Sequence, residues 1–435
     1  MILGGALLFA CTPISGWLAS QSSEEPPATF DIITATTQPT KVLATATLAP
    51  IPSPVGTPTN SSAAPEEDLS LNSVFSSEEI PSGILTDLWV DGDGELWLSG
   101  SQGVLRREDG EWLALYDQPA DLILGEDAIG RVWVVLDDGA AIGAWRDGDW
   151  TVYGPERGWQ PPERGGYLSR GFGDGLVMDE QGRLWLATGR DDLRRLNPEN
   201  GQWQRLSARM IGFAPPDEEG YQGHFLTDVA LSGSDKVWVS NCIGVGEGLD
   251  GQGIQRYSGE EWLSTAFTAD DCIFDLEEGA RGVMWAGAID DLLRYSPITG
   301  SWSRIRLPIW GRFQVVLDVT LDEQGRPWVE LLRAGGASLD GGAAHFYLDG
   351  DEWVPVIEQG ASWEPYSLVQ AGEGKAWIYL KGVLYFADGK GLQEIGSLPV
   401  WYMDLAVDGK GRLWLANVRA PESAVWYFDP PVEED

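Results

Sequence analysis

The sequence predicts an all-β protein, a β-propeller of eight four-stranded blades, with seven blades as the alternative. One phrase recurs eight times in the 435 residues: an apolar run, an Asp-x-x-Gly-x-x-Trp segment or a close variant of it, and a second apolar run. Its tryptophans are spaced 36 to 53 residues apart, and the pattern between them is strand-like throughout. Repeats of this length built only from strands are typical of propeller blades. The eight tryptophans are Trp97, Trp133, Trp185, Trp238, Trp285, Trp328, Trp377 and Trp414.

Each copy contains a tight hairpin turn between its first apolar run and its tryptophan. In five copies an aspartate precedes a glycine by three residues, as Asp91 precedes Gly94. An aspartate accepts hydrogen bonds from the backbone two residues on, and glycine tolerates the positive φ of a hairpin. The copies at Trp285 and Trp377 keep the glycine without the aspartate, and the copy at Trp238 has Ser-Asp-Lys instead. We therefore interpret the turn as structural, because the strand resumes at once and no distal glutamate completes a calcium loop.

A second, weaker tryptophan series completes the four-stranded unit. Strand A, a turn, strand B with the first tryptophan, strand C, a turn, and strand D with the second tryptophan follow one another. The second series is Trp112, Trp150, Trp203, Trp262, Trp302 and Trp353. Because tryptophan buries a large area and packs well between twisted sheets, we expect all 14 in the core between blades.

The last unit lacks a strand D, and an unassigned strand precedes the first unit. The chain ends shortly after the strand over 424–428, whereas residues 69–75 are apolar and β-prone. We predict that residues 69–75 complete the last blade and close the ring, which removes exposed sheet edges. If one irregular unit, the second or the seventh, is absorbed as a loop, the ring has seven blades.

The N-terminal residues predict where the propeller works. Residues 1–11 resemble a bacterial lipoprotein signal that ends in a lipobox cysteine, Cys11, although no Lys or Arg precedes it. Residues 12–67 are rich in Pro, Thr and Ser and read as a disordered tether. The propeller is expected over 68–430 and an acidic tail over 431–435. The sequence thus predicts an extracytoplasmic protein, lipid-anchored to the bacterial cell envelope.

The composition limits the classes of partner and cofactor that the chain is expected to bind. A formal net charge of −38 makes binding to a nucleic acid backbone improbable. No apolar run after residue 11 approaches the length of a membrane span, so the membrane is expected to be reached only through the lipid anchor. With two histidines no His-rich metal site is expected, and we predict no cofactor and a monomer. Cys242 and Cys272 are candidates for a disulfide between blades four and five, with two free thiols as the alternative.

Long links predict one functional face. The A-to-B and C-to-D turns are short, and all extra length falls in the B-to-C and D-to-A links, which share a face. These links contain tryptophans that belong to neither series, together with tyrosines and arginines. We predict that these side chains lie at the mouth of the central channel of the ring and bind a ligand there by stacking and hydrogen bonding. The alternative is that they only fill the mouth of the channel. The candidate ligand-binding residues are Trp159, Tyr167, Arg170, His224, Asp271, Trp310, Arg312, Arg333, Trp363, Tyr366 and Trp401.

Phrases such as 88–100, Leu-Trp-Val-Asp-Gly-Asp-Gly-Glu-Leu-Trp-Leu-Ser-Gly, and the matching run over 177–188 resemble the two-component regulator propeller repeat. The resemblance extends over residues 83–420 as a series of short matches. It implies an extracellular, sensor-type propeller, of which several members recognise glycans. The kinase, membrane helix and immunoglobulin-like domain of those sensors have no counterpart in this sequence, so only the recognition head is implied.

The sequence is compatible with three functions. The first is a ligand-binding propeller for a glycan, peptide or protein partner. The second is a structural or assembly scaffold. The third is a propeller lyase or hydrolase, for which His224 beside Asp228 is the candidate pair, although a buried structural histidine explains that position equally simply.

Overall fold

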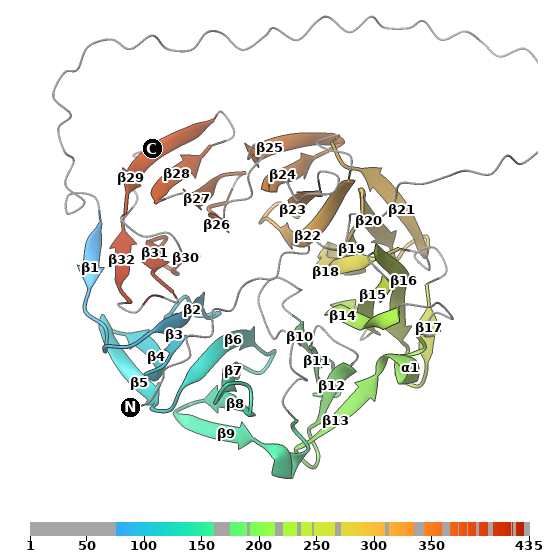
Figure 1. The fold of residues 1–435 in the computed structure, drawn as a ribbon, viewed down its shortest axis with the longest axis horizontal. Coiled ribbons are helices and arrows are strands. Elements are labelled where there is room, and N and C mark those ends of the chain that lie inside the picture. Colours follow the sequence, from blue (N-terminus) through green and yellow to red (C-terminus); the bar gives the residue numbers. More distant parts are fainter. Residues whose placement is uncertain are drawn as a thin grey trace, which may run out of the picture. The chain divides into compact units, whose positions relative to one another are not determined.

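Eight antiparallel sheets of four strands each stand in a ring (Figure 1). The prediction of an eight-bladed propeller is therefore confirmed, and the seven-bladed alternative is wrong. The structure, a computed structural model, describes residues 75–429 with several gaps. The gaps are 161–174, 189–191, 214–220, 233–235, 246–247, 266–270, 309–312, 335–342, 359–365, 373, 381, 389–390, 399–402, 419 and 421–422.

Consecutive strands in the chain pair with each other, so that each blade is a meander with strand A nearest the centre of the ring (Figure 1). Blade 1 consists of β2 (Leu85–Val90), β3 (Leu96–Gly100), β4 (Gly103–Glu108) and β5 (Glu111–Tyr116), and blade 2 of β6 (Ala120–Glu126), β7 (Val132–Leu136), β8 (Ala141–Arg146) and β9 (Asp149–Tyr153). Blade 3 consists of β10 (Leu176–Met178), β11 (Leu184–Ala187), β12 (Asp192–Asn197) and β13 (Gln202–Ser207), and blade 4 of β14 (Tyr221–Ser232), β15 (Lys236–Val245), β16 (Gly248–Tyr257) and β17 (Trp262–Ser264). Blade 5 consists of β18 (Ile273–Gly279), β19 (Val283–Ala288), β20 (Asp291–Ser296) and β21 (Ser301–Arg306), and blade 6 of β22 (Phe313–Leu321), β23 (Pro327–Ala334), β24 (Ala343–Asp349) and β25 (Glu352–Glu358). Blade 7 consists of β26 (Tyr366–Gln370), β27 (Ala376–Leu380), β28 (Val383–Ala387) and β29 (Leu392–Ser397), and blade 8 of β30 (Asp404–Val407), β31 (Leu413–Ala416) and β32 (Val425–Phe428) together with β1 (Ser76–Glu78).

Helical structure is confined to short connections in the part of the chain that the structure describes. The α-helix α1 (Ala208–Ile211) follows β13, and two single 3-10 turns, Pro155–Arg157 and Ala280–Gly282, lie beside strands. Over the same residues, no helix has the length and apolar character needed to span a membrane.

The hydrophobic core is divided among the eight junctions between neighbouring blades. One apolar cluster occupies each junction, and each contains one first-series tryptophan, as Trp185 does between blades 3 and 4. These eight indoles are 0–7 % exposed, which confirms the predicted core role. The second series does not follow the prediction throughout. Trp203 is buried, but Trp112, Trp150 and Trp302 are only half-buried, because strand D is the outer strand of its blade.

The Asp-x-x-Gly-x-x-Trp phrase folds as predicted, and its aspartate has a second role that the sequence analysis missed. In blade 1 one carboxylate oxygen of Asp91 accepts from the backbone N–H groups of Asp93 and Glu95, at 3.1 and 2.8 Å. The other oxygen accepts from Nε1 of Trp97, six residues on. We call this second contact the Asp–Trp lock. It recurs in five blades, as Asp91–Trp97 at 2.8 Å, Asp127–Trp133 at 2.8 Å, Asp179–Trp185 at 2.8 Å, Asp322–Trp328 at 3.2 Å and Asp408–Trp414 at 2.9 Å.

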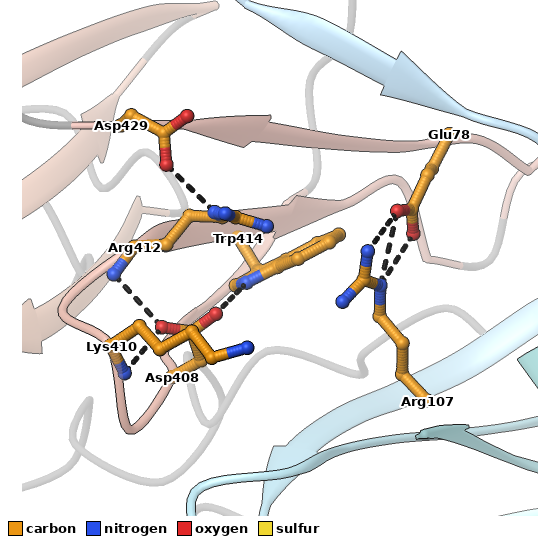
Figure 2. A network of polar contacts seen from close by, with 7 residues as sticks. All are labelled: Glu78, Arg107, Asp408, Lys410, Arg412, Trp414 and Asp429. Carbon is orange, nitrogen blue, oxygen red and sulfur yellow. Dashed lines mark hydrogen bonds and ion pairs between the residues drawn. The ribbon is translucent and has the colours of Figure 1, made fainter. Parts of the chain in front are cut away.

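The N-terminal strand lies beside blade 8. β1 pairs with β32 in antiparallel register from Ser76–Tyr427 to Glu78–Val425. Glu78 also accepts from the Arg107 guanidinium of blade 1, at 2.6 Å from Nη2, close to the Asp–Trp lock of blade 8 (Figure 2). The closing strand was predicted over 69–75, whereas the strand that pairs with β32 spans Ser76–Glu78. Residues 69–74 lie outside the described residues, and closure of the ring by an N-terminal strand stays a prediction.

Candidate functional site

Trp159 does not belong to a ligand-binding channel mouth. Its side chain is 0 % exposed in the core between blades 2 and 3. Its Nε1 donates to the backbone oxygen of Gly139 at 3.0 Å, and its ring meets that of Trp203 edge-on with centroids 5.2 Å apart. The Arg194 guanidinium lies 5.4 Å from its ring centroid. The prediction is wrong at this residue, because the link folds back into the junction and satisfies the indole there.

His224 and Asp271 are also engaged within the protein. His224 in β14 is 5 % exposed, and its Nδ1 lies 3.3 Å from the Asn241 side-chain nitrogen. Asp271 holds the Arg304 guanidinium with both carboxylate oxygens, at 3.0 and 2.7 Å. This hydrogen bond raises the pKa of Arg304. Both side chains thus have partners within the protein, and their place in a ligand-binding channel mouth stays a prediction.

Most other candidates lie where the structure gives no side-chain description. Arg333 lies in β23 and Tyr366 begins β26, and nothing is described of their side chains. The remaining candidates, and the proposed lipidated cysteine, lie outside the described residues: Tyr167, Arg170, Trp310, Arg312, Trp363, Trp401 and Cys11. The channel-mouth site therefore stays a prediction for these residues.

Cys242 and Cys272 form a disulfide with their Cα atoms 4.5 Å apart. Cys242 lies in β15 of blade 4, and Cys272 directly precedes β18 of blade 5. Both are buried beside Phe274 in a small apolar cluster of their own. The bond thus joins neighbouring blades, in the arrangement that the sequence suggested.

A cavity of about 370 Å³ lies between blades 6 and 7. One wall consists of Asp318, Thr320 and Leu321 of β22, Glu330 of β23 and His345 of β24, and the other wall of Leu368, Val369 and Gln370 of β26. The size lies within the range of ligand-binding pockets. Gln370 spans the two blades, since its side-chain nitrogen donates to Oγ1 of Thr320 at 2.7 Å.

Three of the lining residues form one polar row across blade 6. Asp318 pairs in register with Glu330, and Glu330 pairs with His345, so the three side chains stand on the same face of the sheet. Other blades have a small and an aliphatic residue beside the aspartate of strand A. Their rows are Asp87–Ser99–Val104 in blade 1, Asp275–Gly287–Leu292 in blade 5 and Asp404–Ala416–Val425 in blade 8.

The electrostatics of this row favour a neutral imidazole beside carboxylates. His345 is 7 % exposed, and its burial lowers its pKa from 6.5 to about 3. The imidazole is therefore uncharged at neutral pH. Asp318 and Glu330 are half-buried at the same face. Together they provide carboxylate acceptors and a neutral imidazole, which can accept at one nitrogen and donate at the other.

The strand A aspartates connect blades along the inner wall of the ring. An aspartate stands ten residues before the first-series tryptophan in five blades. Asp228 accepts from the Leu276 N–H at 2.9 Å, and Asp275 accepts from the Val319 N–H at 2.7 Å, each bond reaching the next blade. Burial and then the charges of Asp228 and Asp318 raise the pKa of Asp275 well above its ordinary value. The sequence analysis missed this series, although its fixed spacing from the tryptophan made it visible.

Comparison with known proteins places the chain by fold only. No protein-family model and no curated protein sequence matches it. Solved structures with a similar fold include the extracellular domain assigned to a hybrid two-component system of B. thetaiotaomicron, at 12 % identity and a TM-score of 0.41, covering 83 % of this chain and 55 % of that one. They also include virginiamycin B lyase from Staphylococcus aureus, at 11 % identity and a TM-score of 0.43, covering 82 % and 99 %. YCF48 from Cyanidioschyzon merolae has 13 % identity and a TM-score of 0.44, covering 82 % and 99 %.

Such low identities concern the fold, because propellers of unrelated function share it. The chain spans about half the length of the sensor domains that it matches. Extracellular sensor domains are nevertheless among its structural neighbours. The extracellular sensor domains and this chain share the propeller fold, and the likeness extends no further than that.

Proposed function

We propose that this chain is an extracytoplasmic recognition propeller that binds a hydroxyl-rich ligand such as a glycan, or a peptide, in the cavity between blades 6 and 7. The observation that carries the proposal is the row Asp318–Glu330–His345. Two carboxylates and an imidazole thereby line one wall of the cavity. Blades 1, 5 and 8 have small and aliphatic residues at the last two positions of this row. A departure of this kind in one copy of a repeat points to function.

The chemistry of the cavity selects the ligand class. The carboxylates of Asp318 and Glu330, together with the net charge of −38, disfavour an anion at this cavity. Hydroxyl groups of a sugar, or the N–H groups of a peptide, can donate to these carboxylates. Leu368 and Val369 on the opposite wall supply apolar contact for the carbon face of such a ligand.

Recognition is favoured over catalysis by the same residues. An imidazole with a pKa of about 3 is a weak base and carries no proton to donate as an acid at neutral pH. The alternative of a lyase or hydrolase that uses His345 is therefore the weaker one. The disulfide between blades 4 and 5 supports an oxidising, extracytoplasmic compartment. Attachment through a lipid on Cys11 remains part of the proposal.

The test is binding by the full chain on glycan and peptide arrays, followed by titration of the best ligand. Glu330→Gln is expected to weaken binding by roughly tenfold or more, the value of a hydrogen bond to a charged group. Asp318→Asn should act similarly, whereas Asp87→Asn provides the matched control, since it alters the same row in blade 1. Equal affinity of wild type and both blade 6 variants, or no array ligand at all, would contradict the proposal and leave a scaffold role.

A further inference from the structure

Blade 4 lacks the carboxylate of the Asp–Trp lock. Ser232 stands six residues before Trp238, where Asp91 stands before Trp97. The two positions are structurally equivalent, because Ser232 pairs with Lys236 at the start of its hairpin just as the Asp91 N–H bonds to the Glu95 oxygen. Nε1 of Trp238, which is 1 % exposed, is buried and has no hydrogen-bond partner among the residues that the structure describes.

The guanidinium that accompanies the lock is still present in blade 4. In blade 1, Trp97 and Arg106 pair in register across β3 and β4, and both donate to the same oxygen of Asp91, at 2.8 and 3.3 Å. In blade 4, Trp238 and Arg256 pair in the same way, with the guanidinium 5.7 Å from the indole centroid. Nε of Arg256 is likewise buried without a partner. The donors of the lock are thus in place around a missing acceptor.

A cavity of about 360 Å³ lies at this position, at the junction of blades 4 and 5. Trp238, Arg256, Tyr295 and Trp302 line it. The aromatic side chains form a box, with ring centroids 5.0 to 5.7 Å apart. Nε1 of Trp302 is a third buried donor without a partner. The other described residues that line it are Leu263, Ser264, Thr265, Gly300 and Ser301, and none of these is acidic.

We infer that this cavity binds a carboxylate, which takes the place of the aspartate absent from the blade 4 lock. A buried donor without a partner destabilises the folded protein, and an acceptor that reaches the donor removes that cost. A carboxylate bound beside a guanidinium gains a charge-assisted hydrogen bond. Ser264 and Ser301 are exposed at the rim, so the cavity opens to solvent.

The carboxylate has three plausible sources that share this chemistry: a peptide C-terminus, an acidic side chain, or a uronic acid. The inference does not depend on the cavity between blades 6 and 7, because the two sites share no lining residue. Their ligands also differ in charge. The cavity between blades 6 and 7 presents carboxylates, whereas the described lining of this one contains a guanidinium and two indole N–H donors and no carboxylate.

The test is NMR of the indole N–H groups of the full chain, with the Trp238 signal assigned through Trp238→Phe. Sodium acetate is added first, and N-acetylglycine, N-acetyl-glutamate amide and glucuronate follow as probes of the three sources. We expect the Trp238 indole proton to move downfield in a saturable manner, toward the position of the Trp97 proton. The Trp97 indole, already bonded to Asp91, is the internal control and should not move. Arg256→Met should weaken acetate binding by roughly tenfold or more.

A second variant supplies the acceptor from within. Ser232→Asp restores the aspartate of the lock, so its Trp238 signal should lie downfield without any ligand and should no longer respond to acetate. Its melting temperature should also exceed that of the wild type. A wild-type Trp238 signal that ignores all four probes at saturating concentration would overturn the inference. An equal response of Ser232→Asp and wild type would overturn it as well, since the carboxylate would then bind elsewhere.

Discussion

His345 should make the protein progressively less stable as the pH falls below 6.5. Its folded-state pKa of about 3 lies below the ordinary value of 6.5. Between these two pH values the imidazole of His345 is protonated in the unfolded chain but not in the folded protein. The stability present above pH 6.5 is therefore lost as the pH falls. The loss is about 1.4 kcal/mol per pH unit, which amounts to about 2 kcal/mol at pH 5. His345→Gln, which does not titrate, should lack this loss.

The assay is urea unfolding of wild type and His345→Gln from pH 4.5 to 8, with the difference in unfolding free energy plotted against pH. The difference should be constant above pH 7 and should shift in favour of the variant below 6.5. His224→Gln is the control, because these two are the only histidines in the chain. The reasoning is refuted if the difference does not change with pH or changes in the opposite direction. In that case the carboxylates of Asp318 and Glu330 keep the imidazole protonated in the folded state.

Four further predictions concern other parts of the chain. Asp275→Asn should gain stability relative to wild type as the pH rises above 3.8, because the raised pKa of Asp275 means that the folded state holds a proton that the unfolded state releases; unfolding at pH 4 and pH 7 checks the sign. Trp159→Ala should lower the unfolding free energy by roughly 3–5 kcal/mol through the cavity it leaves, and a change in ligand affinity without that loss would restore its place at the channel mouth. Deletion of residues 68–80 should expose a sheet edge and promote aggregation, measured by light scattering, if the N-terminal strand closes the ring. Cys11→Ser should release the protein from the membrane fraction if Cys11 is acylated, and identical fractionation of variant and wild type would exclude the anchor.

The fold was predictable because the repeat is encoded locally. A hairpin turn, a tryptophan six residues after its aspartate, and strand-length apolar runs all lie within a short stretch, and the same pattern or a close variant recurs in each copy. Because the pattern recurs eight times, it leaves little freedom in the number of blades. The bounds of the strand beside β32 were less predictable, because nothing local in the sequence favours residues 76–78, where the structure has it, over the more apolar 69–75.

The candidate site was harder to predict because its residues meet only through strand register. Asp318, Glu330 and His345 are separated by 12 and 15 residues in the sequence, and one shifted pair would place them on opposite faces. One local signal did exist. Glu330 is the charged residue at the position two after the first-series tryptophan, where the other seven copies have Ser, Val, Ala, Ser, Gly, Tyr and Ala. The prediction for Trp159 failed for the opposite reason, since a tryptophan outside the repeat was assumed to be outside the core.

In a repeat protein each position of one copy can be compared with the equivalent position in the other copies. Both proposed sites come from this comparison between blades. Blade 6 keeps its Asp–Trp lock, Asp322–Trp328, and departs from the repeat in the row beside the inner wall. Blade 4 keeps its inner aspartate, Asp228, which bonds to the next blade, and departs at the lock. In each of these two blades one element is intact, and a cavity lies at the element that changed. The same framework can therefore carry two sites of opposite charge preference, each of which can be removed by substitution without touching the other.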